Sequence, residues 1–259
     1  MKILVTGHKG FIGQNMIHAL KGHDLTCYEW GDALPKVDNF NQVIHLGAIS
    51  STTERDVDRV MQQNFEFSCW LLNECEEAGV NFQYSSSASV YGLVSDFKED
   101  SPKSPMSPYA WSKYLFDRHV ESRKWYTRVQ GFRYFNVYGP HEEHKGNQAS
   151  PQYQFTKQAK ETGVIKLFEN SENYLRDFVP VETVVDMHTR FFNVKESGIW
   201  NIGTGDPVSF EYVARNIAEQ YGARIEIIPM PEVLKTQYQT YTCADMNKLR
   251  VTLNENSNS

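Results

Sequence analysis

Tyr109 and Lys113 are the residues of this sequence whose types and spacing could do chemistry together. They lie four positions apart in the segment Ser-Pro-Tyr-Ala-Trp-Ser-Lys, a spacing that places two side chains on one face of a helix. A phenol ionises near pH ~10, and a neighbouring ammonium group favours the phenolate and lowers that pKa. The pair therefore predicts a tyrosine that Lys113 tunes to act as a proton-transfer group near neutral pH. Such pairs are common on ordinary surface helices, so the prediction depends on what surrounds this one.

A glycine-rich segment near the start of the chain supplies that context. Gly7, Gly10 and Gly13 follow the short apolar run 2–6 and open a predicted helix over residues 11–21. Glycines at this place permit a tight turn and let backbone amides approach a pyrophosphate, and the positive end of the helix dipole favours an anion. A glycine-rich turn without a ligand is the alternative. The position after a strand favours a dinucleotide site.

Glu29 is the candidate for the hydroxyl groups of an adenosine ribose. It closes the second predicted strand, residues 25–30, and Asp32 is the second choice. A carboxylate at this place bonds the ribose 2′-hydroxyl and repels a 2′-phosphate. A surface acid in a turn is the alternative. The cofactor predicted here is NAD or NADP, with a lean to NAD.

The elements that must position these residues alternate between strands and helices. Further strands are predicted at 42–46, 81–85 and 128–135, and helices at 57–78, with Gly79 at its end, and at 108–125. This alternation is typical of an α/β fold with a doubly wound, parallel, Rossmann-type sheet. Ligands bind such sheets beyond the carboxyl ends of their strands. The serine cluster 85–87 and the segment 136–140 lie at those ends as well.

The pattern changes after about residue 140. We therefore expect a dinucleotide-binding domain over 1–140 and a smaller C-terminal substrate lobe over 141–259, with helices near 152–161 and 210–221. A strand at 199–203 is expected to rejoin the main sheet. The Asn/Ser-rich end, 254–259, is expected to be frayed.

Composition excludes several functional classes. The chain has 259 residues and a formal net charge of −6, which argues against a nucleic-acid-binding protein. No apolar run approaches the ~18 residues of a membrane span, and no basic cluster indicates a membrane surface. The four cysteines, at 27, 69, 75 and 243, are scattered and are interpreted as packing residues. A cytoplasmic protein is expected.

Beyond these residues, the chain resembles the extended short-chain dehydrogenase/reductase family of nucleotide-sugar epimerases and dehydratases over nearly its whole length. Within that family it is most similar to the epimerases of ADP-glycero-manno-heptose. The segments that carry the resemblance are 50–54, 132–140, 144–150, 167–173, 176–179 and 234–239. The loop around Lys145 and the segment 168–173 are the more specific of them.

The resemblance implies a role for each matching position. The catalytic residues would be Ser87, Tyr109, Lys113 and, as a second acid/base group, Lys145. Besides the three glycines, Glu29 and Lys113, the cofactor would contact Phe11, Ile12, Leu46, Gly47, Ala48, Ser50, Asn64 and Val137. The ADP-sugar would contact Ser87, Asn136, Asn147, Gln154, Phe168, Glu169, Asn170, Ser171, Arg176 and Tyr238. From the residues alone, a surface amide is favoured for Asn64. The alternatives are a solvated loop lysine for Lys145 and a surface ion pair with Asp177 for Arg176.

The resemblance also implies a reaction: redox-neutral epimerisation at C6 of the heptose through a transient 6-ketone, within the carbohydrate metabolism that supplies lipopolysaccharide. It further implies a homo-oligomer. The alternatives are another nucleotide-sugar epimerase, a dehydratase or reductase, and a non-catalytic nucleotide-sugar-binding protein. Ala88-Ser89 after Ser87 counts against a dehydratase, which needs an acid and a base there.

Two features depart from the pattern of the family, and one histidine-containing segment requires a separate interpretation. The connection from Glu29 to Gln42 is very short, although relatives carry another strand and helix there, so looser adenine binding is expected. The chain stops soon after residue 250, where the family continues through a closing helix. His141-Glu142-Glu143-His144 lacks the spacing of a helical zinc motif, so it is interpreted as part of the substrate loop, and no metal is predicted.

Overall fold

The computed structural model describes residues 1–232 and 239–257. Its centre is a six-stranded sheet in the order β10-β5-β4-β3-β1-β2, in which every neighbouring pair is parallel. The strands are β1 (Lys2–Thr6), β2 (Asp24–Tyr28), β3 (Gln42–His45), β4 (Asn81–Ser87), β5 (Val129–Tyr134) and β10 (Gly198–Ile202). The predicted Rossmann-type α/β fold is confirmed.

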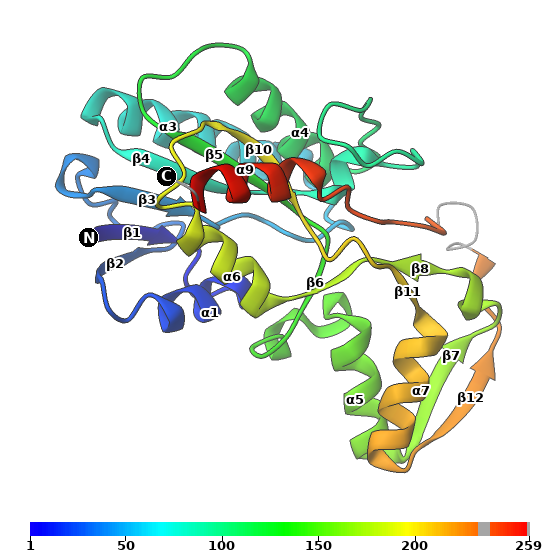
Figure 1. Ribbon diagram of the computed structural model, residues 1–259. Helices are drawn as coiled ribbons and strands as arrows, with labels where there is room; N and C mark the ends of the chain where they lie inside the picture. The colour runs from blue at the N-terminus through cyan, green and yellow to red at the C-terminus, as the bar shows by residue number, and fades with distance from the viewer. Residues whose placement is uncertain (233–238, 258–259) are drawn as a thin grey trace.

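Helices cover both faces of this sheet (Figure 1). They are α1 (Phe11–Ala19) and α6 (Val181–Arg190) on one face, and α3 (Phe67–Ala78) and α4 (Pro108–Glu121) on the other. Alternate residues of β1 point to opposite faces of the sheet and contact different helices. Ile3 and Val5 pack with α1 and α6, whereas Leu4 packs with α3 and α4. A strand buried on both faces is a continuous apolar run, which is how the sequence reads here.

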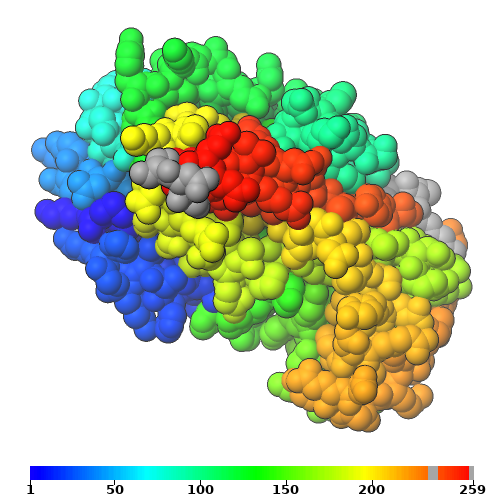
Figure 2. All heavy atoms as spheres, in the orientation of Figure 1, coloured from blue at the N-terminus to red at the C-terminus, as the bar shows by residue number. Residues whose placement is uncertain are grey.

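A second group of elements follows the main sheet. The strands β7 (Val164–Phe168) and β12 (Arg224–Ile228) pair in parallel. The helices α5 (Pro151–Thr162) and α7 (Phe210–Tyr221) pack with them around a separate apolar cluster. This group projects from the main body, with α7 in orange at the lower right of Figure 2. Two short ladders, β6 (Asn136–Tyr138) with β9 (Phe178–Pro180) and β8 (Leu175–Arg176) with β11 (Val208–Ser209), lie between it and the main sheet.

The end of the chain differs from the expectation of a frayed tail without a closing helix. Residues Asn247–Ser257 form the helix α9, which lies as a red band along one face of the molecule (Figure 2). Leu249 packs into the cluster that contains Trp200, and Trp200 Nε1 donates to Thr252 Oγ1 at 3.0 Å. Apolar burial and this hydrogen bond hold α9 against β10, although the composition of α9 is mostly polar.

The helix predicted over 57–78 is interrupted. It consists of α2 (Val57–Val60), a π-helical segment (Met61–Glu66) and α3. A π segment changes which side chains face inward and occurs often at functional sites. The crossing from β2 to β3 is as short as the sequence indicates, with a single 3₁₀ turn at Val37–Asn39.

Candidate active site

A cavity of about 360 Å³ lies at the carboxyl ends of the central strands. Most of the residues predicted for catalysis and cofactor binding line it: Gly7, Gly10, Phe11, Ile12, Gly13, Glu29, Leu46, Gly47, Ala48, Ser50, Tyr109 and Lys145. They come from segments far apart in the sequence. The parallel sheet brings them together because the strand ends share one edge.

The physical reason for a glycine differs among the three positions of the turn. Gly7 has a φ of +73°, and a Cβ there would lie 2.5 Å from Gly47 Cα. A Cβ at Gly13 would lie 2.0 Å from the Gly7 carbonyl oxygen. At Gly10 the nearest protein atom to a Cβ is 3.3 Å away, so protein packing alone does not demand glycine there. Gly10 caps α1 without a side-chain hydrogen bond, which leaves first-turn amides of the helix available for a pyrophosphate.

Glu29, rather than Asp32, faces the cavity. The Glu29 carboxylate lines it, and its Oε1 accepts a hydrogen bond from the Lys9 amide at 2.7 Å and lies 3.3 Å from His8 Nδ1. Asp32 instead accepts from the Glu29 amide at 3.2 Å and closes the turn after β2. Glu29 therefore connects the glycine turn to the end of β2, in the position predicted for a ribose contact.

Tyr109, Lys113 and Ser87 meet where α4 begins against β4. Ser107 caps α4 by accepting from the Ala110 amide at 3.2 Å, which fixes the start of the helix that carries both groups. Tyr109 is partly buried and hydrogen-bonds the Ser87 side chain. Lys113 Nζ donates to the Ser85 carbonyl oxygen at 2.7 Å and to Ser85 Oγ at 3.2 Å. Ser85 and Tyr109, the partners of Lys113 and Ser87, line the cavity, whereas Ser87 and Lys113 themselves are not among its lining residues.

The pKa of the Tyr109 phenol is raised above its ordinary value, and the lowering expected from Lys113 stays a prediction. Burial raises the pKa of the Tyr109 phenol, the Ser87 hydrogen bond opposes that shift, and the charge of Asp117 adds to it. Burial also lowers the pKa of Lys113 to about 8, while Asp117 opposes that shift. Burial is the largest cause of both shifts, because the low-dielectric interior disfavours the charged form of each group.

Lys145 enters the same cavity from a different element. It lies in a 3₁₀ segment, Glu143–Gln148, with Nζ 3.6 Å from Glu142 Oε2 and 4.9 Å from the centre of the Phe11 ring. Burial lowers the pKa of Lys145, and the Glu142 carboxylate opposes that shift. The solvated-lysine reading therefore does not describe this side chain.

Glu142 organises the loop that carries Lys145. The carboxylate is buried and accepts hydrogen bonds from the Gly139 amide at 3.0 Å and from the Ser150 amide and hydroxyl at 2.6 and 2.7 Å. Within residues 1–232 and 239–257, no three His, Cys, Asp or Glu side chains are grouped as metal ligands. Glu142 thus has a structural use in the loop.

Asn64, which sequence alone would place at the surface, is buried. Its amide donates to the Ile49 carbonyl oxygen and to Ser112 Oγ, and its Oδ1 accepts from the Ile49 amide, all within 3.1 Å. Ser112 Oγ in turn donates to the Tyr109 carbonyl oxygen at 2.7 Å. Asn64 therefore ties the loop after β3 to the helix turn that carries Tyr109. Neither Asn64 nor Val137 lines the cavity itself.

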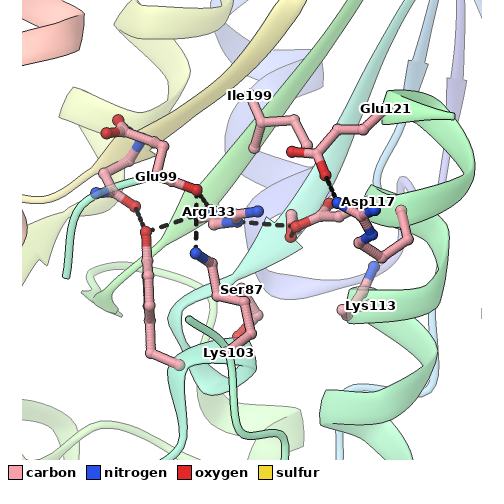
Figure 3. A network of polar contacts seen from close by, with 12 residues as sticks. Ser87, Glu99, Lys103, Lys113, Asp117, Glu121, Arg133 and Ile199 are labelled. Carbon is pink, nitrogen blue, oxygen red and sulfur yellow. Dashed lines mark hydrogen bonds and ion pairs between the residues drawn. The ribbon is translucent and has the colours of Figure 1, made fainter. Parts of the chain in front are cut away.

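A buried ion pair supports the catalytic helix from behind. Arg133 Nε lies 2.8 Å from Asp117 Oδ2, with side chains 2% and 0% exposed. Asp117, one turn beyond Lys113, also accepts from Tyr84 and Ser86 hydroxyls, each at 2.9 Å. Figure 3 shows Arg133 extending from Asp117 to Glu99, whose carbonyl oxygen accepts at 2.9 Å. The pair could not be predicted from the sequence, because no motif or helical spacing connects positions 117 and 133.

A second cavity, of about 170 Å³, lies in the projecting group of elements. Of the predicted substrate residues, Gln154, Phe168 and Ser171 line it, together with Ala149, Pro151, Phe155, Lys166, Leu167, Tyr174 and Phe210. Arg176 is buried and donates to the carbonyl oxygens of Leu175 and Gln239. The others, Asn136, Asn147, Glu169 and Asn170, line neither cavity, and Tyr238 lies outside the described residues.

Four further residues line the main cavity without having been predicted: Ser85, Ser86, Tyr134 and His144. The two serines belong to the cluster that the sequence analysis singled out, and His144 neighbours Lys145. Tyr134 lies in the segment 132–140 that carries the family resemblance, but no role was assigned to it. None of the described helices is long and apolar enough to cross a membrane.

Comparison with solved structures supports the same architecture. The crystal structure of Helicobacter pylori ADP-L-glycero-D-manno-heptose-6-epimerase matches with a TM-score of 0.87 and 26% identity, over 98% of this chain and 90% of that chain. The Thermus thermophilus UDP-glucose 4-epimerase in complex with NAD matches with a TM-score of 0.81 over the full length of both chains. At 23% identity, that likeness establishes the fold alone.

Sequence comparison gives the family. The chain is 39% identical, over 96% of its length and 90% of the relative, to ADP-L-glycero-D-manno-heptose-6-epimerase of Brachyspira hyodysenteriae. A family model described as NAD dependent epimerase/dehydratase matches residues 3–203, a range that includes the glycine turn, Ser87, Tyr109, Lys113 and Lys145. The chain belongs to the NAD dependent epimerase/dehydratase family.

Proposed function

We propose that this protein epimerises C6 of an ADP-glycero-manno-heptose with a tightly bound NAD. The observation that carries the proposal is that Tyr109 and Lys145, from two different elements, line one cavity together with the glycine turn. The likeness to the two heptose epimerases supports the choice of sugar. Glu29 at the ribose end supports NAD over NADP, since a carboxylate repels a 2′-phosphate.

The chemistry explains why two acid/base groups are useful. The C6 proton of a heptose is not acidic, so inversion requires oxidation to a 6-ketone and reduction on the opposite face. The bound nicotinamide supplies reversible hydride acceptance. In one orientation of the sugar, Tyr109 takes the proton from the C6 hydroxyl. In the opposite orientation, Lys145 transfers the proton to or from that oxygen. Ser87 holds the reacting oxygen. Lys113 orients the nicotinamide ribose. A lysine suits this role because burial lowers its pKa towards the working range.

The projecting group of elements, α5, β7, α7 and β12, is proposed to hold the ADP part, whereas α6 and α9 of the expected lobe 141–259 pack on the main sheet. Phe168 and the polar Gln154 and Ser171 line its cavity, a combination suited to a nucleotide base and ribose. The Arg176 guanidinium, on β8 between this group and the main sheet, is proposed to contact the pyrophosphate, which such a planar fork bonds in a bidentate way.

Incubation with ADP-D-glycero-D-manno-heptose tests the proposal, with the C6 configuration followed by NMR. Inversion without net reduction of the cofactor is the expected result. Loss of water or accumulation of reduced nicotinamide would point to a dehydratase or reductase. Binding without turnover would point to a nucleotide-sugar-binding protein.

Lys145→Met is expected to lower epimerisation by about 10²–10⁴-fold, the usual contribution of a general acid or base. One of the two sugar presentations should still be served by Tyr109. A single turnover with one C6 epimer should therefore still produce reduced nicotinamide absorbance, whereas the other epimer should not. Lys157→Met, on an exposed part of α5, is the control and should leave both readings unchanged. Equal loss with both epimers would exclude the two-group mechanism.

A homo-oligomer in the cytoplasm is also proposed. Val57, on α2, and Trp111, on α4, are 51% and 46% exposed and stand on two helices that contact each other; a contiguous apolar patch there would favour association. The four cysteines are unpaired, as is usual in a reducing compartment. Light scattering of the purified protein measures the oligomeric state.

A further inference from the structure

The crossing between β2 and β3 is short, with a single 3₁₀ turn at Val37–Asn39, so few elements cover the adenine side of the site. Three aromatic side chains stand at that end. Phe67 stacks on Tyr28 with ring centres 5.6 Å apart, and Trp30 meets Phe67 edge to face at 5.4 Å. Trp30 is 47% exposed. A large indole held by another ring, yet open to solvent on the rest of its surface, is a ready stacking partner.

These side chains line a small cavity that continues the main one. Its volume is about 140 Å³, and its walls include Trp30, Phe67 and Gln63. It shares Gly7, Glu29, Gly47 and Ala48 with the main cavity, but Tyr109 and Lys145 line only the main one. The small cavity therefore lies at the end of the site away from the catalytic groups, beyond Glu29.

The order of groups along a dinucleotide determines which group binds at this end of the site. With the nicotinamide beside Tyr109 and the pyrophosphate at the start of α1, the adenosine ribose falls at Glu29. The base attached to that ribose then enters the small cavity. Gln63, partly buried in the π-helical segment, contributes an amide with both donor and acceptor atoms to this cavity. Such an amide matches the N6 and N7 atoms of adenine.

Resting on the proposed use of NAD, we propose that adenine stacks on the Trp30 indole as its platform, which the perpendicular Phe67 ring holds in place, with the Gln63 amide on the edge of the base. The tryptophan covers the end of the site beside this short crossing. The expectation of looser adenine binding is thereby replaced by a specific aromatic contact. Asp32 has no part in it, since it closes the turn after Trp30.

Calorimetric titration of nucleotide-free protein tests the platform with three probes: NAD, ADP-ribose and nicotinamide mononucleotide, which lacks adenine. Trp30→Ala is expected to weaken binding of NAD and ADP-ribose by about tenfold or more, the usual effect of losing one base–aromatic stack. Its affinity for nicotinamide mononucleotide should not change. Trp30→Phe should restore affinity to within about threefold of wild type, because it keeps an aromatic face.

Trp70→Ala is the matched control. Trp70 is 45% exposed and also contacts Phe67, at 5.8 Å, but it lines neither cavity. Its loss should leave all three affinities unchanged. Unchanged NAD and ADP-ribose affinity in Trp30→Ala would overturn the platform while leaving the proposed function intact. A wild-type protein that binds none of the three probes would overturn the proposed function itself.

Fluorescence provides a second reading should Trp30→Ala fail to fold. ADP-ribose is expected to quench part of the tryptophan emission of the wild-type protein, because the base covers the Trp30 indole. The quenching should disappear in Trp30→Phe and persist in Trp70→Phe. Quenching that survives in Trp30→Phe would assign the signal to another tryptophan and overturn the proposal.

Discussion

Tyr109→Phe is expected to lower the rate of epimerisation by about 10²–10⁴-fold, the contribution of a positioned proton-transfer group. The substitution removes one oxygen and keeps the ring that lines the cavity. Because the contacts that hold Lys113 run to Ser85 rather than to the phenol, the site should keep its shape. The Kd for NAD, measured calorimetrically, should therefore change by less than about threefold, since at most one weak hydrogen bond is lost.

Tyr114→Phe provides the control for this experiment. Tyr114 lies on the same helix, is partly buried, and packs with another cluster away from the cavity. It should keep the wild-type rate. A Tyr109→Phe enzyme with the wild-type rate would remove the phenol from the mechanism, and a parallel loss of NAD affinity would indicate a binding role instead.

Asp117→Asn is expected to lower the free energy of unfolding by about 3–5 kcal/mol, because it leaves the buried Arg133 cation without its counter-charge. Asparagine has nearly the same size but only one acceptor oxygen, so it can accept either from Tyr84 or from Ser86 and Arg133, but not at both positions. The expected loss therefore combines the missing charge with at least one unmade hydrogen bond. The hydrogen bonds of Arg133 to Tyr91 and to the Glu99 carbonyl oxygen (Figure 3) do not neutralise its charge. Urea unfolding followed by circular dichroism measures the loss.

The chain contains a matched surface pair for comparison. Arg190 Nε also lies 2.8 Å from a carboxylate oxygen, that of Asp186, but these side chains are 56% and 50% exposed. Asp186→Asn should cost no more than about 1 kcal/mol, since solvent screens the pair. The double variant Asp117→Asn/Arg133→Gln should recover part of the loss of the single variant. Equal losses for the buried and the surface aspartate would contradict this account of Arg133.

The fold was predictable because its signals are local. Apolar runs such as residues 2–6, the glycine turn that follows and the capped helix beginning at Pro108 are each read within a few positions. The rule that strand ends meet at one edge then placed Glu29, Tyr109 and the serine cluster together. Of the end predicted to be frayed, residues 254–257 instead continue α9, whose preceding residues pack against Trp200, a contact that no window of sequence contains.

The sequence by itself determined the sheet, the glycine turn and the helical spacing of Tyr109 and Lys113, because chain geometry and side-chain period fix these. Only the tertiary structure decided the electrostatics: the raised pKa of Tyr109, the buried Asp117–Arg133 pair and the contact of Lys145 with Glu142. It also decided that Asn64 is buried and that Trp30 adjoins Phe67. Burial and charge depend on groups brought together from distant positions, and their effect grows as water is excluded.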